Sequence, residues 1–538
     1  MPIELSHWGT HVACALKARG VDTLFTLSGY HIFPILDGCV QAQIRIVDFR
    51  HEASAAFAAE AYGRLTHTVG VAAVTAGPGN FNAVNALASA LKNRSPLAVL
   101  GGRSRQEGWG KGSLQEMEHV PVMAPLCKIA KTVFGPDVLR EVSAALREAE
   151  TAPRGAVFFD FPTDLNAEGA LESADASAPR RLEPDSSAVR QIASLVNKAA
   201  KPLLLAGANV YLDRAWESMR AWVEAAQVPV LTNGLGRGTL PADHRLAFQR
   251  TRGKAFGEAD LVIVAGTPMD FRIGYGEGFA AEASVVHLDS SPEQLTKVRP
   301  LAASIGADLD LTFRALGRET KRRGGEEWVA ELRAEENRIT AKASEEGSAD
   351  RTPIHPLRLY AELKKHLARD AVVACDGGDF VSYAGREIPS YVPGAWLDPG
   401  PFGCLGVGPG YAIAAKLRYP GRQVVLILGD GAFGFSGMEF DTMFRHKLPI
   451  VAVVGNNGIW ALEKHPMKGL FGYDVAADLR QDTRYDQVVQ ALGGYGERVT
   501  RPDQLGPAFK RAFEAGVPAL VNVHIDPEVI YPRSANLM

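Results

Sequence analysis

The stretch GDGAFGFSGMEFDTMFRHKLPIVAVVGNNGIWALEKH, residues 429–465, decides the fold of this chain. It follows the apolar run VVLIL at 424–428, which predicts a buried parallel strand. A helical pattern comes next and ends before Pro449, and IVAVV at 450–454 predicts the following strand. A strand, a helix and a strand in this order predict two parallel strands whose carboxyl ends lie at one edge of a sheet.

Polar residues follow both of these strands. Asp430 comes directly after the first strand and offers a hard carboxylate oxygen, while Asn457 after the second strand offers an amide oxygen. The two can share one magnesium ion, whose remaining positions suit phosphate oxygens and water. Gly429 and Gly431 let the backbone approach a phosphate closely. The stretch therefore predicts a magnesium and phosphate site at this edge.

A GDG sequence followed by paired asparagines resembles the cofactor motif of thiamine diphosphate enzymes. The resemblance implies thiamine diphosphate and Mg²⁺ as cofactors. It implies Asp430, Asn457 and the backbone carbonyl of Ile459 as metal ligands, and Gly431 and Ala432 as further cofactor contacts. The alternative is an ordinary strand-helix-strand unit in which GDG is only a turn.

The length of 538 residues predicts about three domains. A polar stretch at 172–187 and a highly charged, helix-like stretch at 321–353 divide the chain into segments 1–175, 186–335 and 350–538. Helical and strand patterns alternate in each segment. We therefore expect an α/β protein with three doubly wound parallel-sheet domains.

Composition excludes several classes of partner. A formal net charge of −3 gives no reason to expect binding to nucleic acid or to an anionic membrane surface. The five cysteines lack CxxC spacing, which argues against a zinc site or a disulfide framework and suits a reducing cytosol. No signal-peptide pattern and no apolar run of membrane-spanning length occur, so we expect a cytoplasmic protein.

RHEASAAFAAEAYGR at 50–64, followed by TAGPGNFNAVNAL at 75–87, resembles the pyrimidine-binding domain of the same enzymes. The resemblance implies that Glu52 contacts a ring nitrogen of the cofactor's aminopyrimidine and that Gly77 lines the cofactor site. The alternative, which does not depend on the resemblance, is that Glu52 is only an acid at a helix N-terminus, where the helix dipole favours negative charge.

Two polar residues are further candidates near the reacting atoms. LSGYHIFPILDG resembles the active-site loop of benzaldehyde lyase and places His31 at that family's histidine. SLQEMEH places Gln115 at a glutamine position that several members share. The alternatives are a core histidine and a glutamine that only bridges loops.

The last segment adds a second phosphate loop, CDGGDF at 375–380, with Gly378, Asp379 and Phe380 as candidate cofactor contacts. WLDPGPFGCLGVGPGYAIAAK at 396–416 adds Gly403 and Leu405. Leu405 matches the family position whose apolar side chain supports the bent cofactor; the alternative is a core leucine.

The middle segment has no GxGxxG dinucleotide fingerprint. It resembles the central domain that binds FAD in acetolactate synthase and ADP or coenzyme A in oxalyl-CoA decarboxylase and 2-hydroxyacyl-CoA lyase. NGLGRGTLPADH at 233–244 is nearer the second group, so ADP or CoA is the expected ligand, with FAD or no ligand left open. Candidate substrate or nucleotide contacts are Arg252, Lys254, Asp289 (otherwise a helix cap) and Arg533, which lies in a tail expected to act as a lid.

NNGIWALEKH resembles NNDGYTIEK of pyruvate decarboxylase, which implies that Glu463 takes part in proton transfers at the substrate. We expect an apolar setting for it beside Trp460 and Leu462. The alternative is an exposed helical glutamate paired with a neighbouring lysine. The 2-hydroxyacyl-CoA lyases of other branches lack this LEK pattern.

Nearly the whole chain resembles the acetolactate synthase-like superfamily, including 2-hydroxyacyl-CoA lyase, benzaldehyde lyase and actinobacterial acetolactate synthase-like proteins. The resemblance implies a homodimer or homotetramer with the cofactor between chains, and an acyl-CoA or 2-oxo acid substrate. We expect cleavage of a 2-hydroxyacyl-CoA to an aldehyde or ketone plus formyl-CoA. The alternatives are carboligation of two 2-oxo acids, 2-oxo acid decarboxylation and a non-catalytic cofactor-binding protein, against which the intact Glu52, Asp430 and Asn457 argue.

Overall fold

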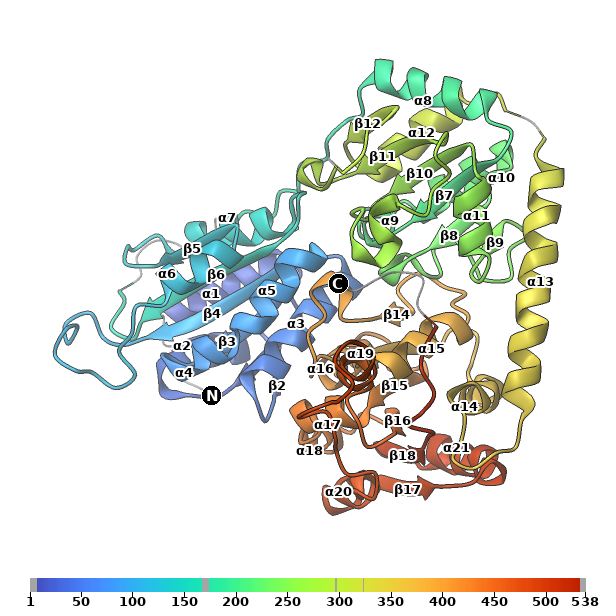
Figure 1. Cartoon of the computed structure of the whole chain (residues 1–538). Coiled ribbons are helices and arrows are strands. Elements are labelled where there is room, and N and C mark those ends of the chain that lie inside the picture. Colours follow the sequence, from blue (N-terminus) through green and yellow to red (C-terminus); the bar gives the residue numbers. More distant parts are fainter. Residues whose placement is uncertain (1–6, 167–173, 296–297, 323, 533–538) are drawn as a thin grey trace. The chain divides into compact units, whose positions relative to one another are not determined.

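The computed structural model describes residues 7–166, 174–295, 298–322 and 324–532. Within them the chain forms three six-stranded sheets, and neighbouring strands are parallel throughout. Helices cover the faces of each sheet (Figure 1). This confirms the expected α/β class with three parallel sheets.

The chain is organised in two compact units. The first comprises the described parts of residues 1–180, with 402–420 and 436–448. The second comprises the described parts of 181–401, 421–435 and 449–538. The first unit contains one sheet and the second contains two.

The sheet of the first unit has the strand order β2-β1-β3-β4-β6-β5. The strands are β1 (Thr23–Leu27), β2 (Arg45–Asp48), β3 (Gly70–Val74), β4 (Leu97–Arg103), β5 (Ile129–Thr132) and β6 (Ala156–Pro162). The helices are α1 (Trp8–Ala18), α2 (Phe33–Gln41), α3 (Glu52–Thr66), α4 (Pro78–Asn82), α5 (Val84–Asn93), α6 (Val120–Met123), α7 (Val138–Glu150), α16 (Gly408–Arg418) and α18 (Glu439–Arg445). The alanine-rich helix α3 is buried along nearly its whole length and packs against α16, because its small side chains permit close helix packing.

The central sheet, in the second unit, has the order β12-β11-β10-β7-β8-β9. This is the order of dinucleotide-binding folds, although the glycine fingerprint is missing. Its strands are β7 (Pro202–Ala206), β8 (Val230–Thr232), β9 (Ala247–Phe248), β10 (Leu261–Ala265), β11 (Ser284–Asp289) and β12 (Ala303–Gly306). Its helices are α8 (Ser186–Lys198), α9 (Ala208–Leu212), α10 (Trp216–Ala226), α11 (Arg252–Glu258), α12 (Leu309–Glu319) and the long α13 (Glu326–Ser348).

The third sheet, also in the second unit, has the order β14-β13-β15-β16-β18-β17, which is the order of the first sheet repeated. Its strands are β13 (Val372–Asp376), β14 (Trp396–Leu397), β15 (Val424–Gly429), β16 (Val451–Asn456), β17 (Tyr495–Val499) and β18 (Ala519–His524). The accompanying helices are α14 (Pro356–Leu363), α15 (Asp379–Glu387), α17 (Asp430–Ser436), α19 (Ala461–Phe471), α20 (Tyr485–Ala491) and α21 (Leu505–Glu514).

The first and third sheets each reverse their order of strand addition at the pair formed by their first and third strands. Ligands of open parallel sheets bind outside the carboxyl ends of the strands at such a point. In the first sheet these ends lead into the segments containing His31 and Gly77, and in the third into Gly378 and Asp430. Strand order alone thus places two groups of candidate residues where ligands bind.

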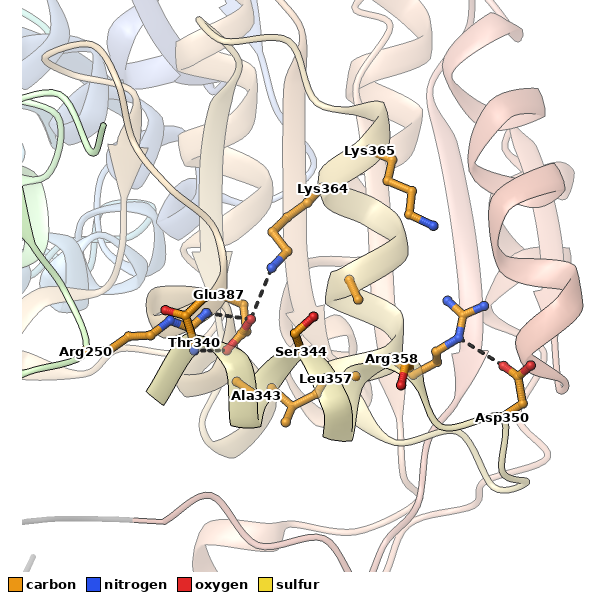
Figure 2. A pocket seen from close by; sticks show the side chains of 13 residues that line it. Arg250, Thr340, Ala343, Ser344, Asp350, Leu357, Arg358, Lys364, Lys365 and Glu387 are labelled. Atoms are coloured by element: carbon orange, nitrogen blue, oxygen red, sulfur yellow. Dashed lines mark hydrogen bonds and ion pairs between the residues drawn. The ribbon is translucent and has the colours of Figure 1, made fainter. Parts of the chain in front are cut away.

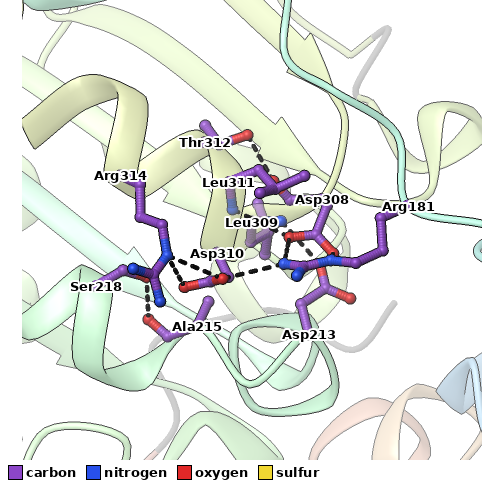
Figure 3. Close-up of polar contacts among 10 residues, drawn as sticks. All are labelled: Arg181, Asp213, Ala215, Ser218, Asp308, Leu309, Asp310, Leu311, Thr312 and Arg314. Atoms are coloured by element: carbon purple, nitrogen blue, oxygen red, sulfur yellow. Dashed lines mark hydrogen bonds and ion pairs between the residues drawn. The ribbon is translucent and has the colours of Figure 1, made fainter. Parts of the chain in front are cut away.

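An ion-pair cluster fixes the chain where it enters the central domain (Figure 3). Arg181 donates to Asp308 through Nε at 2.7 Å and Nη2 at 2.6 Å, and to Asp310 at 3.0 Å. The Asp308 N–H binds the carbonyl of Leu182 at 3.0 Å, and the Asp308 carboxylate caps α12. The end of the polar stretch expected to be a linker is therefore anchored to its own domain.

Among the described residues, no helix combines the length and the apolar character needed to cross a membrane.

Candidate active site

The carboxyl ends of β15 and β16 bring Asp430 and Asn457 together as expected. Gly429 pairs with Gly455 in the parallel register, so both polar residues lie just beyond the same level of the sheet. The Gly458 N–H donates to Asp430 Oδ2 at 2.8 Å, and the Ile459 N–H donates to Asn457 Oδ1 at 3.2 Å.

Asp430 is 3% exposed, and burial raises its pKa to about 6 although backbone N–H groups oppose the shift. Among the described residues, no lysine or arginine forms an ion pair with it. A buried carboxylate without a cationic partner is costly unless a cation joins it. The Asp430 carboxylate, the Asn457 amide and the Ile459 carbonyl all offer hard oxygen atoms, the donor type that Mg²⁺ prefers.

The beginning of α19 lies over this site. A Cβ at Gly431 would come within 2.5 Å of the Trp460 indole, so only glycine allows this contact. The neighbouring Ala432 is buried. The Trp460 ring therefore lies against Gly431, where the sequence predicts a phosphate contact.

The second phosphate loop lies beside the first, because β13 and β15 are neighbours. Gly378 precedes α15, and Asp379 at its first turn accepts the Tyr531 N–H at 3.1 Å. Phe380 stacks on Tyr360 with ring centroids 5.1 Å apart, which makes it a core residue. Tyr531 belongs to the tail from Ile530 onward that is expected to form a lid, and Arg533 of this tail lies outside the described residues.

Glu463 does not have the apolar setting that the sequence predicted. It lies in the first turn of α19 with its side chain exposed. Lys464, its neighbour, pairs instead with Asp474 at 3.0 Å and with Asp478 at 2.5 Å. The helix turns this glutamate outward because positions 461 and 462 face the protein.

In the first unit, Glu52 opens α3 as predicted. It is 7% exposed, and its Oε2 accepts the Asn82 Nδ2 amide at 2.9 Å. Gly79, in α4, lies beside its other carboxylate oxygen. One end of the carboxylate is thereby oriented by the TAGPGNFN segment, as a positioned acid requires.

His31 and Gln115 also contact the TAGPGNFN segment, at Thr75 and Gly77. His31 is 3% exposed, its Nδ1 lies 3.0 Å from Thr75 Oγ1, and burial lowers its pKa. Gln115 has a left-handed backbone with φ of +58°, which is strained for a residue with a side chain, and it contacts Gly77. The structure therefore groups Glu52, His31, Gly77 and Gln115 around one loop.

Gly403 and Leu405 belong to the first unit, just before α16. Gly403 is exposed and Leu405 is partly buried. Cys404 between them lies 3.2 Å from Asn85 Oδ1. Because Leu405 is partly exposed, a role in supporting a ligand suits it better than a role in the hydrophobic core.

Two candidate residues of the central domain, Lys254 and Asp289, already contact neighbouring side chains. Lys254 pairs with Glu258 at 2.6 Å, and Asp289 is fully buried, where it accepts Asn209 Nδ2 at 2.8 Å and caps Ser291. The hydrogen bonds from Asn209 and from the Ser291 N–H orient the Asp289 carboxylate, and its contact with a nucleotide stays a prediction.

Arg252 is half-buried, and a second half-buried arginine, Arg237, which the sequence did not single out as a contact, lies near it. Burial, and to a smaller extent the nearby charge of Arg237, lowers the pKa of Arg252 to about 10. Burial also lowers the pKa of Arg237, which stacks on Trp396 at 4.7 Å. The NGLGRG sequence at 233–238, which contains Arg237, was the available signal.

A cavity of about 470 Å³ lies elsewhere in the second unit, between α13, α14 and the end of α15 (Figure 2). Each of its four cationic side chains pairs with a carboxylate; Arg250 and Lys364 share Glu387 at 2.8 and 3.2 Å. Glu387 ends the helix that Asp379 begins, so this cavity is separate from the magnesium site.

Comparison with known proteins agrees with this arrangement. Family models match residues 7–122 as the N-terminal TPP binding domain, 189–316 as the central domain and 376–523 as the C-terminal TPP binding domain of thiamine pyrophosphate enzymes. The chain is 50% identical over 543 residues to the acetolactate synthase large subunit IlvG of Mycobacterium tuberculosis, covering 100% of this chain and 99% of the relative. It is 36% identical to 2-hydroxyacyl-CoA lyase 2 of Caenorhabditis elegans (92% of this chain, 84% of the relative) and 32% identical to that of Homo sapiens (97% and 90%). The chain therefore belongs to the thiamine pyrophosphate enzymes and is a thiamine diphosphate-dependent enzyme of the acetolactate synthase and 2-hydroxyacyl-CoA lyase type.

Proposed function

We propose that this enzyme joins two 2-oxo acids, releasing carbon dioxide from one of them, as an acetolactate synthase does. The identity of 50% along the full chain carries this proposal, because the identities to 2-hydroxyacyl-CoA lyase 2 are 32–36%. The sequence motifs had favoured 2-hydroxyacyl-CoA cleavage, with carboligation of 2-oxo acids as an alternative; the identities reverse this preference.

Bound thiamine diphosphate supplies a nucleophilic carbon that attacks a carbonyl and stores the electron pair that cleavage releases. In our proposal Asp430, Asn457 and the Ile459 carbonyl hold its Mg²⁺, and Glu52 binds its pyrimidine ring. Gly77 and Leu405 line the cofactor, together with Gly378, Asp379, Gly403, Gly431 and Ala432.

Proton transfer at the substrate falls to side chains of the first unit. Burial lowers the pKa of His31, so its ring is neutral at physiological pH and can accept a proton. Gln115 can orient a substrate oxygen from its strained position on Gly77. Glu463, exposed in this chain, joins them only if a second chain covers α19.

We therefore also propose at least a homodimer, in which Glu52 of one chain faces the magnesium site of another. The exposed position of Glu463 and the apolar side chains that follow it on the surface support this, since Leu470, Phe471 and Tyr473 are 54–65% exposed. Sedimentation that shows a fully active monomer would contradict it.

A second candidate function is cleavage of a 2-hydroxyacyl-CoA to an aldehyde or ketone plus formyl-CoA. The half-buried pair Arg237 and Arg252 favours it, because two neighbouring arginines at the carboxyl edge of a nucleotide-type sheet suit the phosphates of coenzyme A or ADP.

One experiment separates the two functions. The purified enzyme, with thiamine diphosphate and Mg²⁺, is incubated in parallel with pyruvate and with a 2-hydroxyacyl-CoA. We expect acetolactate from the first reaction and little formyl-CoA from the second. Formyl-CoA formation with the higher kcat/KM would establish the lyase instead, and stoichiometric flavin in the protein would exclude ADP or CoA as the resident central ligand.

A further inference from the structure

His119 is a fully buried histidine that the proposed mechanism does not use. It lies four residues after Gln115, at the end of the segment that leads from β4 to α6. Its Nε2 is 2.9 Å from the Gly77 amide nitrogen, and its Nδ1 is 2.7 Å from Asp160 Oδ2. One ring thus connects a cofactor-loop amide to a buried carboxylate.

These two contacts fix the tautomer of the ring. A backbone N–H can only donate, so Nε2 accepts the hydrogen bond from Gly77. The ring proton must then be on Nδ1, which donates to Asp160. Asp160 is itself fully buried near the end of β6, and its Oδ2 also lies 3.5 Å from Arg103 Nη1. The carboxylate therefore holds His119 in the one form that can accept from the loop.

Gly77 has a backbone that needs such support. Its φ of +58° and ψ of −114° lie outside the regions open to other residues, and it directly precedes α4. Gln115 closes the opposite side, since a Cβ on Gly77 would come within 3.0 Å of the Gln115 Cβ. His119 and Gln115, from one segment, thus hold Gly77 from two directions.

Residues on either side of Gly77 contact two other candidate site residues, His31 and Glu52. Thr75 contacts His31 at 3.0 Å, and Asn82, at the end of α4, donates to Glu52 at 2.9 Å. A shift of the peptide at Gly77 would move the start of α4 and, with it, the group that orients Glu52. Buried loops held by few hydrogen bonds depend strongly on each of them.

We propose that His119, oriented by Asp160, is a positioning residue that sets the conformation of the cofactor loop 75–78. This rests on the proposed role of Gly77 in lining the cofactor. His119 is not a general base, because its one lone pair is already engaged by Gly77 and the ring is buried.

The matched variants His119→Gln and His119→Asn test the proposal. The glutamine carbonyl reaches the place of Nε2 and can still accept from Gly77, whereas the shorter asparagine reaches only the place of Nδ1. We expect the asparagine variant to bind thiamine diphosphate about tenfold more weakly, the equivalent of one lost buried hydrogen bond, and the glutamine variant to remain within about threefold of wild type.

Binding is measured by calorimetric titration of the cofactor-free protein with thiamine diphosphate and Mg²⁺, and melting temperatures report folding. Equal affinities of the glutamine and asparagine variants would overturn the proposal. If the asparagine variant does not fold, His119→Met, which fills the site without an acceptor of similar strength, takes its place under the same criterion. Wild-type protein that binds the cofactor but forms no acetolactate would refute the proposed function and leave this inference intact.

Discussion

Replacing Asp430 with asparagine should stabilise the cofactor-free protein at neutral pH and abolish its response to magnesium. Asp430 is 3% exposed, and burial raises its pKa from 3.8 to about 6. An acid whose pKa is higher in the folded chain than in the unfolded chain costs stability once it is ionised. The difference of about 2 pKa units corresponds to about 3 kcal/mol at about pH 7.5.

The sign of this effect gives it a characteristic pH dependence. Below pH 3.8 the Asp430 carboxyl is protonated in both the folded and the unfolded chain, so it does not lower the folding stability. The loss of stability grows as the pH rises toward 6 and is complete above about pH 6. Asparagine has the same shape and no charge, so the advantage of the variant should fall to about half of its neutral value at about pH 5. For a domain of about 200 residues, a gain of about 3 kcal/mol would raise the Tm by at most roughly 6–12 °C.

The assay is calorimetric melting of both proteins, each with and without thiamine diphosphate and Mg²⁺. Wild type should be stabilised by the cofactors and the variant should not, because the only charged member of the proposed metal donor set is gone. Asp482→Asn removes an exposed carboxylate paired with Arg480 and serves as the control for charge alone. A variant that melts at or below wild type without cofactors, or that Mg²⁺ stabilises equally, would refute the reasoning.

Glu52→Gln should retain thiamine diphosphate binding but lower turnover by about 100-fold or more, because the variant cannot exchange a proton with the cofactor ring; turnover within about threefold of wild type would contradict this. In the proposed homodimer, with a second chain covering α19, Glu463→Gln should lower kcat by about 100-fold with cofactor binding unchanged; a value near wild type would leave His31 as the one proposed base. Trp460→Phe should remove most of the fluorescence change on cofactor addition, since the indole borders the cofactor loop; an undiminished change would place the responding tryptophan elsewhere. Deletion from Ile530 onward should lower turnover, because the tail begins with a backbone hydrogen bond to the second cofactor loop, and unchanged turnover would rule out a lid.

The placement of Asp430 and Asn457 beyond two neighbouring strands of the third sheet could be predicted from the sequence. The apolar runs before Asp430 and Asn457, the helical pattern between them and the proline that ends it are all local features. They determine that two consecutive parallel strands end at one edge, and the observed pairing of Gly429 with Gly455 is the consequence. Glu52 could be placed at the start of its helix for the same reason, since the alanine-rich pattern begins there.

Other parts of the site depended on contacts between residues far apart in the sequence. The sequence suggested an apolar setting for Glu463, but the rotation of α19 against the sheet turns it outward. It singled out NGLGRG, which contains Arg237, but not the place of Arg237 beside Arg252. It also gave no sign of His119 between Gly77 and Asp160, because these residues come from different strands or from the segments that follow them.

The sequence by itself thus determined the class of fold, the alternation of strands and helices along the chain, and the polar residues that follow several of the strands. Periodicity and turn-forming residues act over a few positions, so they can be read without the rest of the chain. Only the tertiary structure decided which loop ends meet, which carboxylates are enclosed and which tautomer His119 adopts. Those properties depend on burial and on hydrogen-bond partners brought together by packing, and no local pattern encodes them.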